Sequence, residues 1–65
     1  MSEYYDVGGI KTIDVIQAKL TPEQFEGWLL GNILKYAARA NHKGAKQSDF
    51  EKLAYYSQQL KENKV

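Results

Sequence analysis

One stretch of the chain carries an amide and several cations at helical spacing. The segment GNILKYAARANHKG, residues 31–44, places these side chains three or four residues apart: Asn32, Lys35, Arg39 and Lys43. Residues at this spacing lie on one line along a helix. Arginine offers a planar fork to two phosphate oxygens, lysine a point charge and asparagine directional hydrogen bonds. The spacing therefore predicts a helix edge that binds a phosphate-bearing ligand.

The distribution of charge favours the same interpretation. All eight acids lie outside the stretch from Gly27 to Ser48, although the net charge of the whole chain is only +1. Tyr36 belongs to the basic line and Tyr56 is expected beside it, where an aromatic ring could stack on a base. The local positive charge is thus uncompensated in the sequence, which suits an anion.

A structural alternative stays open for the same residues. Cations near a helix C-terminus offset the macrodipole, and a charged line is commonly a solvated face. Lys35 and Arg39 would then pair with Asp14 and Asp49 and tie three helices together. In the ligand-binding interpretation, the two aspartates instead hold the cations in place.

Other kinds of chemistry find little support in the sequence. The chain has no cysteine and a single histidine, His42, so neither a thiolate site nor a histidine metal site is expected. It lacks the G-x-x-x-x-G-K-S/T phosphate loop and the G-x-G-x-x-G pattern. We therefore predict no catalytic residue, no metal and no cofactor.

Three helices are expected to position the basic line. Residues 1–9 should form an irregular arm with a turn at the paired glycines. Residues 10–20 repeat isoleucine and leucine at helical spacing, with Thr12 as a candidate N-cap. The sequence LTPEQF predicts the next start, with Thr21 as N-cap, Pro22 in the first position and Gln24 completing a capping box. This helix should end near Arg39 or Asn41.

The middle helix has a wide apolar stripe and two glycines. The stripe comprises Phe25, Leu29, Ile33, Tyr36 and Ala40, and is widened by Trp28, Leu30 and Leu34. Gly27 and Gly31, one turn apart, suggest a close crossing with another helix. We expect Gly31→Leu to overpack that crossing at a cost of about 1–3 kcal/mol.

The third helix is expected from Asp49 to Glu62. Gly44 would end the preceding helix, and Ser48 with Glu51 would form a second capping box. Its inward residues should be Phe50, Leu53, Ala54, Ser57 and Leu60, with the two adjacent tyrosines beside them.

The predicted fold is all-α: a single domain over residues 1–65, with an irregular arm, one short helix and a two-helix hairpin. A chain of this length has a marginal core, and the middle helix offers more apolar surface than two neighbours cover. We therefore expect a homo-oligomer with Trp28, Leu30 and Leu34 in the contact. No apolar run reaches the roughly 20 residues of a membrane span, and the polar N-terminus does not resemble a signal peptide. A cytoplasmic protein is expected.

The chain resembles the SaV-like family of small phage proteins, a domain of unknown function often labelled nucleotide kinase. The most specific part of the resemblance is G-N-x-x-K-Y-x-x-R, residues 31–39. The shared positions are Tyr5, Gly9, Ile10, Ile13, Asp14, Ile16, Phe25, Gly27, Gly31, Asn32, Lys35, Tyr36, Arg39, Lys43, Gly44, Asp49, Lys52 and Tyr56. Lys52 is accordingly expected to support the site together with the two aspartates. Phe50, Leu53 and Ser57 depart from the family pattern.

The resemblance implies a phage protein, acting in the host cytoplasm, that binds a nucleotide-like ligand. We expect an oligomeric binder, with sites where subunits meet, that sequesters a host signal nucleotide. The alternatives are an enzyme of nucleotide metabolism, which the missing phosphate loop disfavours, and an accessory protein that binds a host protein. Nucleic acid is a weaker alternative, because the net charge is near zero.

Overall fold

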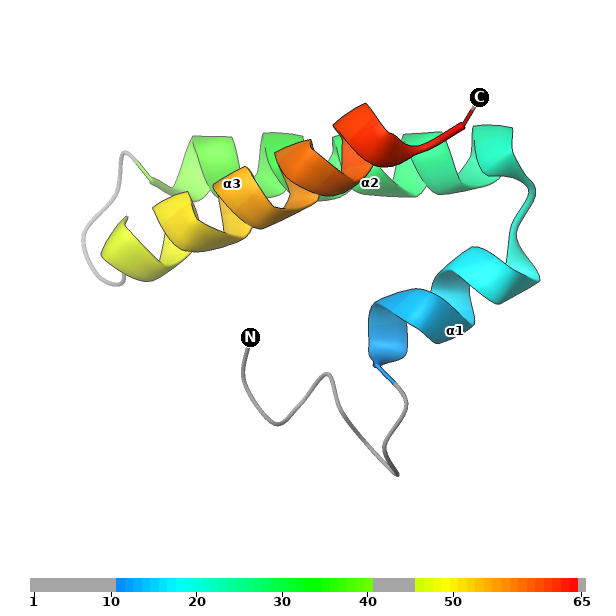
Figure 1. The fold of residues 1–65 in the computed structure, drawn as a ribbon. Helices are drawn as coiled ribbons and strands as arrows, with labels where there is room; N and C mark the ends of the chain where they lie inside the picture. The colour runs from blue at the N-terminus through cyan, green and yellow to red at the C-terminus, as the bar shows by residue number, and fades with distance from the viewer. Residues whose placement is uncertain (1–10, 41–45, 65) are drawn as a thin grey trace.

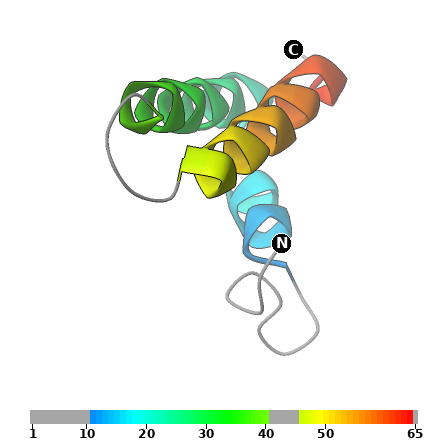
Figure 2. The same ribbon diagram turned by 90° about the vertical axis from the view of Figure 1, so that its left-hand side faces the viewer.

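The computed structural model describes residues 11–40 and 46–64, where every regular element is a helix. The elements are α1 (Thr12–Lys19), α2 (Pro22–Arg39) and α3 (Lys46–Glu62). α2 and α3 run antiparallel, and α1 lies against one side of the pair (Figures 1 and 2). The all-α fold is confirmed over these residues, and the expected arm lies outside them. None of the three described helices is long and apolar enough to cross a membrane.

The start of α2 is the most closely predicted feature. The Thr21 hydroxyl oxygen accepts a hydrogen bond from the Gln24 backbone N–H at 3.1 Å, and the Gln24 side-chain oxygen accepts one from the Thr21 N–H at 2.9 Å. The predicted capping box is therefore confirmed. The Asn63 side-chain amide donates to the Pro22 carbonyl at 3.1 Å, which fastens the end of α3 to the beginning of α2.

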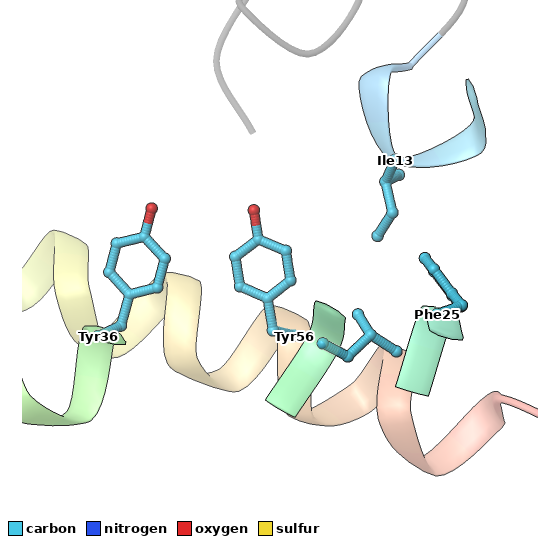
Figure 3. Close-up of a cluster of buried hydrophobic side chains, with 5 residues drawn as sticks. Ile13, Phe25, Tyr36 and Tyr56 are labelled. Atoms are coloured by element: carbon cyan, nitrogen blue, oxygen red, sulfur yellow. The ribbon is translucent and has the colours of Figure 1, made fainter. Parts of the chain in front are cut away.

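The core lies where the three helices meet. Its buried members are Ile13, Phe25, Leu29, Tyr36 and Tyr56, with Leu29 fully enclosed. Ile13 of α1 points toward Phe25 of α2, so α1 covers one end of the hairpin (Figure 3). Toward the other end the core is made of aromatic rings, and Tyr36 stacks on Tyr56 at 5.8 Å between ring centroids.

Two predicted helix starts are wrong. α1 begins at Thr12 itself and its N-cap is Lys11, which makes no side-chain capping hydrogen bond. α3 begins at Lys46, so Ser48 lies inside the helix and the second capping box is not formed. Hydroxyl and carboxylate groups near a helix start are consistent with several cap positions, because either kind of oxygen can accept a backbone N–H and a carboxylate is also favoured throughout the first turn. Gly44 lies outside the described residues.

The inward face of α3 also differs from the prediction. Asp49 and Tyr56 are buried, and Leu53 and Leu60 are half-buried along the same line. The other residues expected inside, Phe50, Ala54 and Ser57, are exposed. The helix is rotated toward its aspartate because Asp49 has a cationic partner on α2 and because the Tyr56 ring fills the centre of the hairpin.

The close crossing expected at the glycines is not made within the described chain. A Cβ atom built on Gly27 or Gly31 would meet nothing within 4 Å. No other helix of the described chain therefore packs closely against either glycine. Two large apolar residues on the same side of α2 also point outward: Leu30 is 43% exposed and Leu34 is 69% exposed. α3 packs on the opposite face of α2, against Phe25, Leu29 and Tyr36.

The capping box gives a direct test of the fold. Thr21→Ala removes the side-chain acceptor of the Gln24 N–H and should lower the free energy of unfolding by about 0.5–2 kcal/mol. Urea denaturation followed by circular dichroism measures this difference. Gln17→Ala, at an exposed position of α1, is the control and should change stability by less than about 0.5 kcal/mol. A Thr21→Ala variant as stable as the parent would contradict a stabilising cap.

Candidate anion-binding site

Three cationic side chains converge on one aromatic ring. The Lys35 Nζ atom lies 4.5 Å from the centroid of the Tyr36 ring, the Lys52 Nζ atom 5.3 Å and the Arg39 Cζ atom 5.5 Å. A cation within about 6 Å of an aromatic face is attracted by the ring quadrupole. We call Lys35, Arg39 and Lys52 the cation cluster, and the Tyr36 ring is the surface on which it rests.

The helical repeat and the tyrosine stack bring these cations together. On α2, Lys35 and Arg39 are four residues apart and lie on either side of Tyr36 along the chain. On α3, Lys52 lies one turn before Tyr56, on the same face. The two tyrosine rings are nearly parallel, with 7° between their planes, and their hydroxyl groups point to the same side of the hairpin (Figure 3). The stack thus brings Lys52 of α3 to the cations of α2.

A buried carboxylate anchors the arginine of the cluster. Arg39 Nη2 lies 3.7 Å from Asp49 Oδ1, and the side chains are 55% and 5% exposed. Within the described part of the chain this Asp49 oxygen has no hydrogen-bond partner, so the nearby arginine is its main polar neighbour there. The pairing of these two residues expected from the sequence is present. Asp14 is exposed on α1 and forms no ion pair with a described residue.

The cluster keeps a surplus of positive charge. Among residues 11–40 and 46–64, Arg39–Asp49 is the single ion pair, and neither Lys35 nor Lys52 has a carboxylate within 4.0 Å. Contact with the Tyr36 face leaves the ammonium N–H groups able to donate hydrogen bonds. An anion that approaches the cluster would therefore meet charge that the described chain has not neutralised.

Two other residues predicted for the site have different outcomes. The Asn32 side-chain amide donates to the Trp28 carbonyl at 2.9 Å, so one of its two N–H groups is already used within α2. Lys43 lies outside the described residues. In the described part of the chain, no three histidine, aspartate or glutamate side chains gather closely enough to hold a metal ion.

The sequence assigned Lys52 and Asp49 a supporting position, but the structure places both directly at the cluster. The four-residue spacing between Lys52 and Tyr56 was the available signal for the lysine. No comparable signal exists for the burial of Asp49, because an acid in a first helical turn is commonly exposed and stabilised by the macrodipole.

The fold and the cluster define a helical-hairpin protein whose candidate site is built from side chains. The chain belongs to the family DUF3310, a protein family of unknown function, whose model matches residues 1–58. Its relatives include a protein named Nucleotide kinase gp1.7 from Escherichia phage T7, 36% identical over 66 residues, which cover 97% of this chain and 34% of that protein. The Gene 1.7 protein of Enterobacteria phage T3 is 37% identical over 60 residues, covering 88% and 37%.

These matches confirm the resemblance to phage proteins of unknown function, whereas the SaV-like name is not confirmed. The chain spans about a third of the length of both phage relatives. No solved structure matches it significantly.

The ion pair can be tested by a double-mutant cycle. Arg39→Ala should lower the free energy of unfolding by about 1–3 kcal/mol, because it leaves the buried Asp49 carboxylate without its cation. In an Asp49→Asn background the same substitution should cost less, because no buried charge remains. Urea denaturation of the four proteins measures the coupling. Purely additive effects would show that the two side chains do not interact.

Proposed function

We propose that the chain binds a phosphate-bearing, nucleotide-like ligand through the cation cluster above Tyr36. The observation that carries the proposal is the convergence of Lys35, Arg39 and Lys52 on one ring with a single, buried carboxylate beside them. Cations held near one another repel, and an anion between them relieves that repulsion. Because the ring already orients the cations, less side-chain freedom is lost when the ligand binds.

The cation cluster accounts only for recognition of the phosphate. Other observations must indicate what the rest of the ligand is. The sequence suggested that a base would stack on Tyr36 or Tyr56, but both rings are at least 95% buried. The two rings therefore lie beneath the cationic side chains in the core, and neither has an exposed face on which a base could stack. The nucleotide class is supported by the name of the T7 relative. Binding without turnover would suit a phage protein that sequesters a nucleotide signal of its host.

A thermal-shift screen tests this function. Inorganic phosphate and mono-, di-, tri- and cyclic nucleotides are compared at constant ionic strength, because salt screens such contacts. A ligand at about 100 times its dissociation constant should stabilise the parent by roughly 2.7 kcal/mol. Lys35→Gln should reduce that stabilisation while leaving the unliganded fold intact, since Lys35 is exposed and has no ion pair with a described residue.

Lys61→Gln is the matched control for this screen. Lys61 is an exposed lysine in the last turn of α3, far along the helix from Lys52, so its loss changes the net charge equally without touching the cluster. Equal loss of ligand stabilisation in both variants would indicate a general charge effect. No stabilisation of the parent by any phosphate compound would contradict the proposal.

Phosphoryl transfer is the second candidate, favoured by the printed name of the T7 relative. Incubation with deoxynucleoside monophosphates, ATP and Mg²⁺ distinguishes the candidates. Diphosphate product formed by the parent and lost in Lys35→Gln would assign transfer to this chain. We expect stabilisation without product, because the sequence contains no phosphate loop to position a second nucleotide.

A further inference from the structure

One face of α2 is apolar although it points away from α1 and α3. We call it the outer face, and its members are Gly27, Leu30, Gly31, Leu34, Ala37 and Ala38, all exposed. Helices on a protein surface normally present charged and polar residues there. On α2 the charged and polar residues are instead confined to the two ends of the helix and to the two sides of the outer face. A continuous uncharged face of this kind is typical of an interaction surface.

The two glycines make the outer face accessible to another backbone. Glycine inside a helix is destabilising relative to alanine, yet a Cβ atom at position 27 or 31 would meet nothing within 4 Å. No packing contact in the described chain therefore calls for glycine. Beside Leu34, which is 69% exposed, the glycines leave a low strip between larger side chains. Such small-residue strips allow two helices to approach closely.

We propose that the outer face of α2 docks on the outer face of a second copy, with the two α2 helices antiparallel. The charge along α2 selects this partner and this direction. Glu23 and Glu26 lie in its N-terminal half, and Lys35 and Arg39 in its C-terminal half. An antiparallel copy sets the acidic half of each helix beside the basic half of the other, whereas a parallel copy sets like charges together. Antiparallel helix dipoles add to the preference.

The shape of the outer face agrees with this arrangement. α2 spans Pro22–Arg39. When two antiparallel copies overlap over their full length, Pro22 of one copy lies opposite Arg39 of the other. In that register Leu34 of one copy lies opposite Gly27 of the other. Leu34, the most exposed of the large apolar side chains in the described chain, then meets a residue without a side chain. The same patch serves both chains, as a two-fold dimer requires. This inference shares Lys35 and Arg39 with the cation cluster, but it does not require that a ligand binds there.

Sedimentation velocity at tens of micromolar tests the dimer. The parent should sediment with twice the mass of the 7.4 kDa chain, and Leu34→Glu should sediment as a monomer with unchanged helical circular dichroism. Val15→Glu places the same charge at another exposed apolar position, 44% exposed on α1, and should sediment like the parent. If Leu34→Glu loses helicity, Gly27→Leu decides, because a Cβ atom at position 27 meets nothing within 4 Å in the described chain and the added side chain would obstruct the docked copy. A monomeric parent, or dimers in both outer-face variants, would overturn the inference.

Engineered cysteines test the direction, and the natural chain contains none. In the proposed register Glu23 of one copy lies opposite Ala38 of the other. A mixture of the Glu23→Cys and Ala38→Cys variants should therefore form a disulfide on mild oxidation, visible on a non-reducing gel. Each variant alone should form no more than Val15→Cys, which measures random collisions. Crosslinking of each variant with itself above that background, or no excess crosslinking in the mixture, would overturn the antiparallel arrangement.

Discussion

The stacking of Tyr36 on Tyr56 is the contact on which both the core and the candidate site depend. The rings lie 5.8 Å apart and nearly parallel, a geometry worth about 0.5–1.5 kcal/mol beyond the burial of their surface. The stack fixes α3 against α2 and thereby sets where Lys52 lies relative to Lys35 and Arg39. Tyr36 faces the core and the cations at once. A change in the helix crossing would therefore disturb the fold and the cation cluster together.

The stack belongs to a continuous series of rings along the hairpin. Phe25 stacks on Trp28 at 5.7 Å, and Trp28 meets the edge of Tyr56 at 5.6 Å. The series thus joins the end of the hairpin that α1 covers to the cation cluster at the other end. Phe25 and Leu29 are the largest side chains that are almost completely enclosed. Because so few large side chains are fully enclosed, the aromatic rings supply much of the contact area that such a small core needs.

The features predicted correctly from the sequence are those decided within a few residues. The capping box at Thr21 requires only local hydrogen bonds, and the apolar repeat of α2 identified Phe25, Leu29 and Tyr36 as its inward residues. The orientation of α3 was not predictable in this way. Its apolar residues fit two neighbouring lines equally well, and the choice between them depends on Asp49, whose partner lies on another helix.

The glycines show the same limit of prediction from local sequence. Their spacing predicted a close crossing with another helix, but periodicity does not say whether that helix belongs to the same chain, and within the described chain none lies there. For the site, the basic line on α2 was visible in the sequence, whereas the contribution of Lys52 depends on the tertiary stack. The sequence also suggested that the tyrosines would stack on a base, which their burial argues against.

The central claim is that the surplus charge above Tyr36 is a binding site for phosphate. A nuclear magnetic resonance titration of the isotope-labelled chain with a nucleoside monophosphate, and separately with inorganic phosphate, tests it most directly. The account predicts saturable shifts in the resonances of Lys35, Arg39 and Lys52, with Val15 on α1 unchanged. Shifts that never saturate, or that are confined to residues away from the cation cluster, would contradict it.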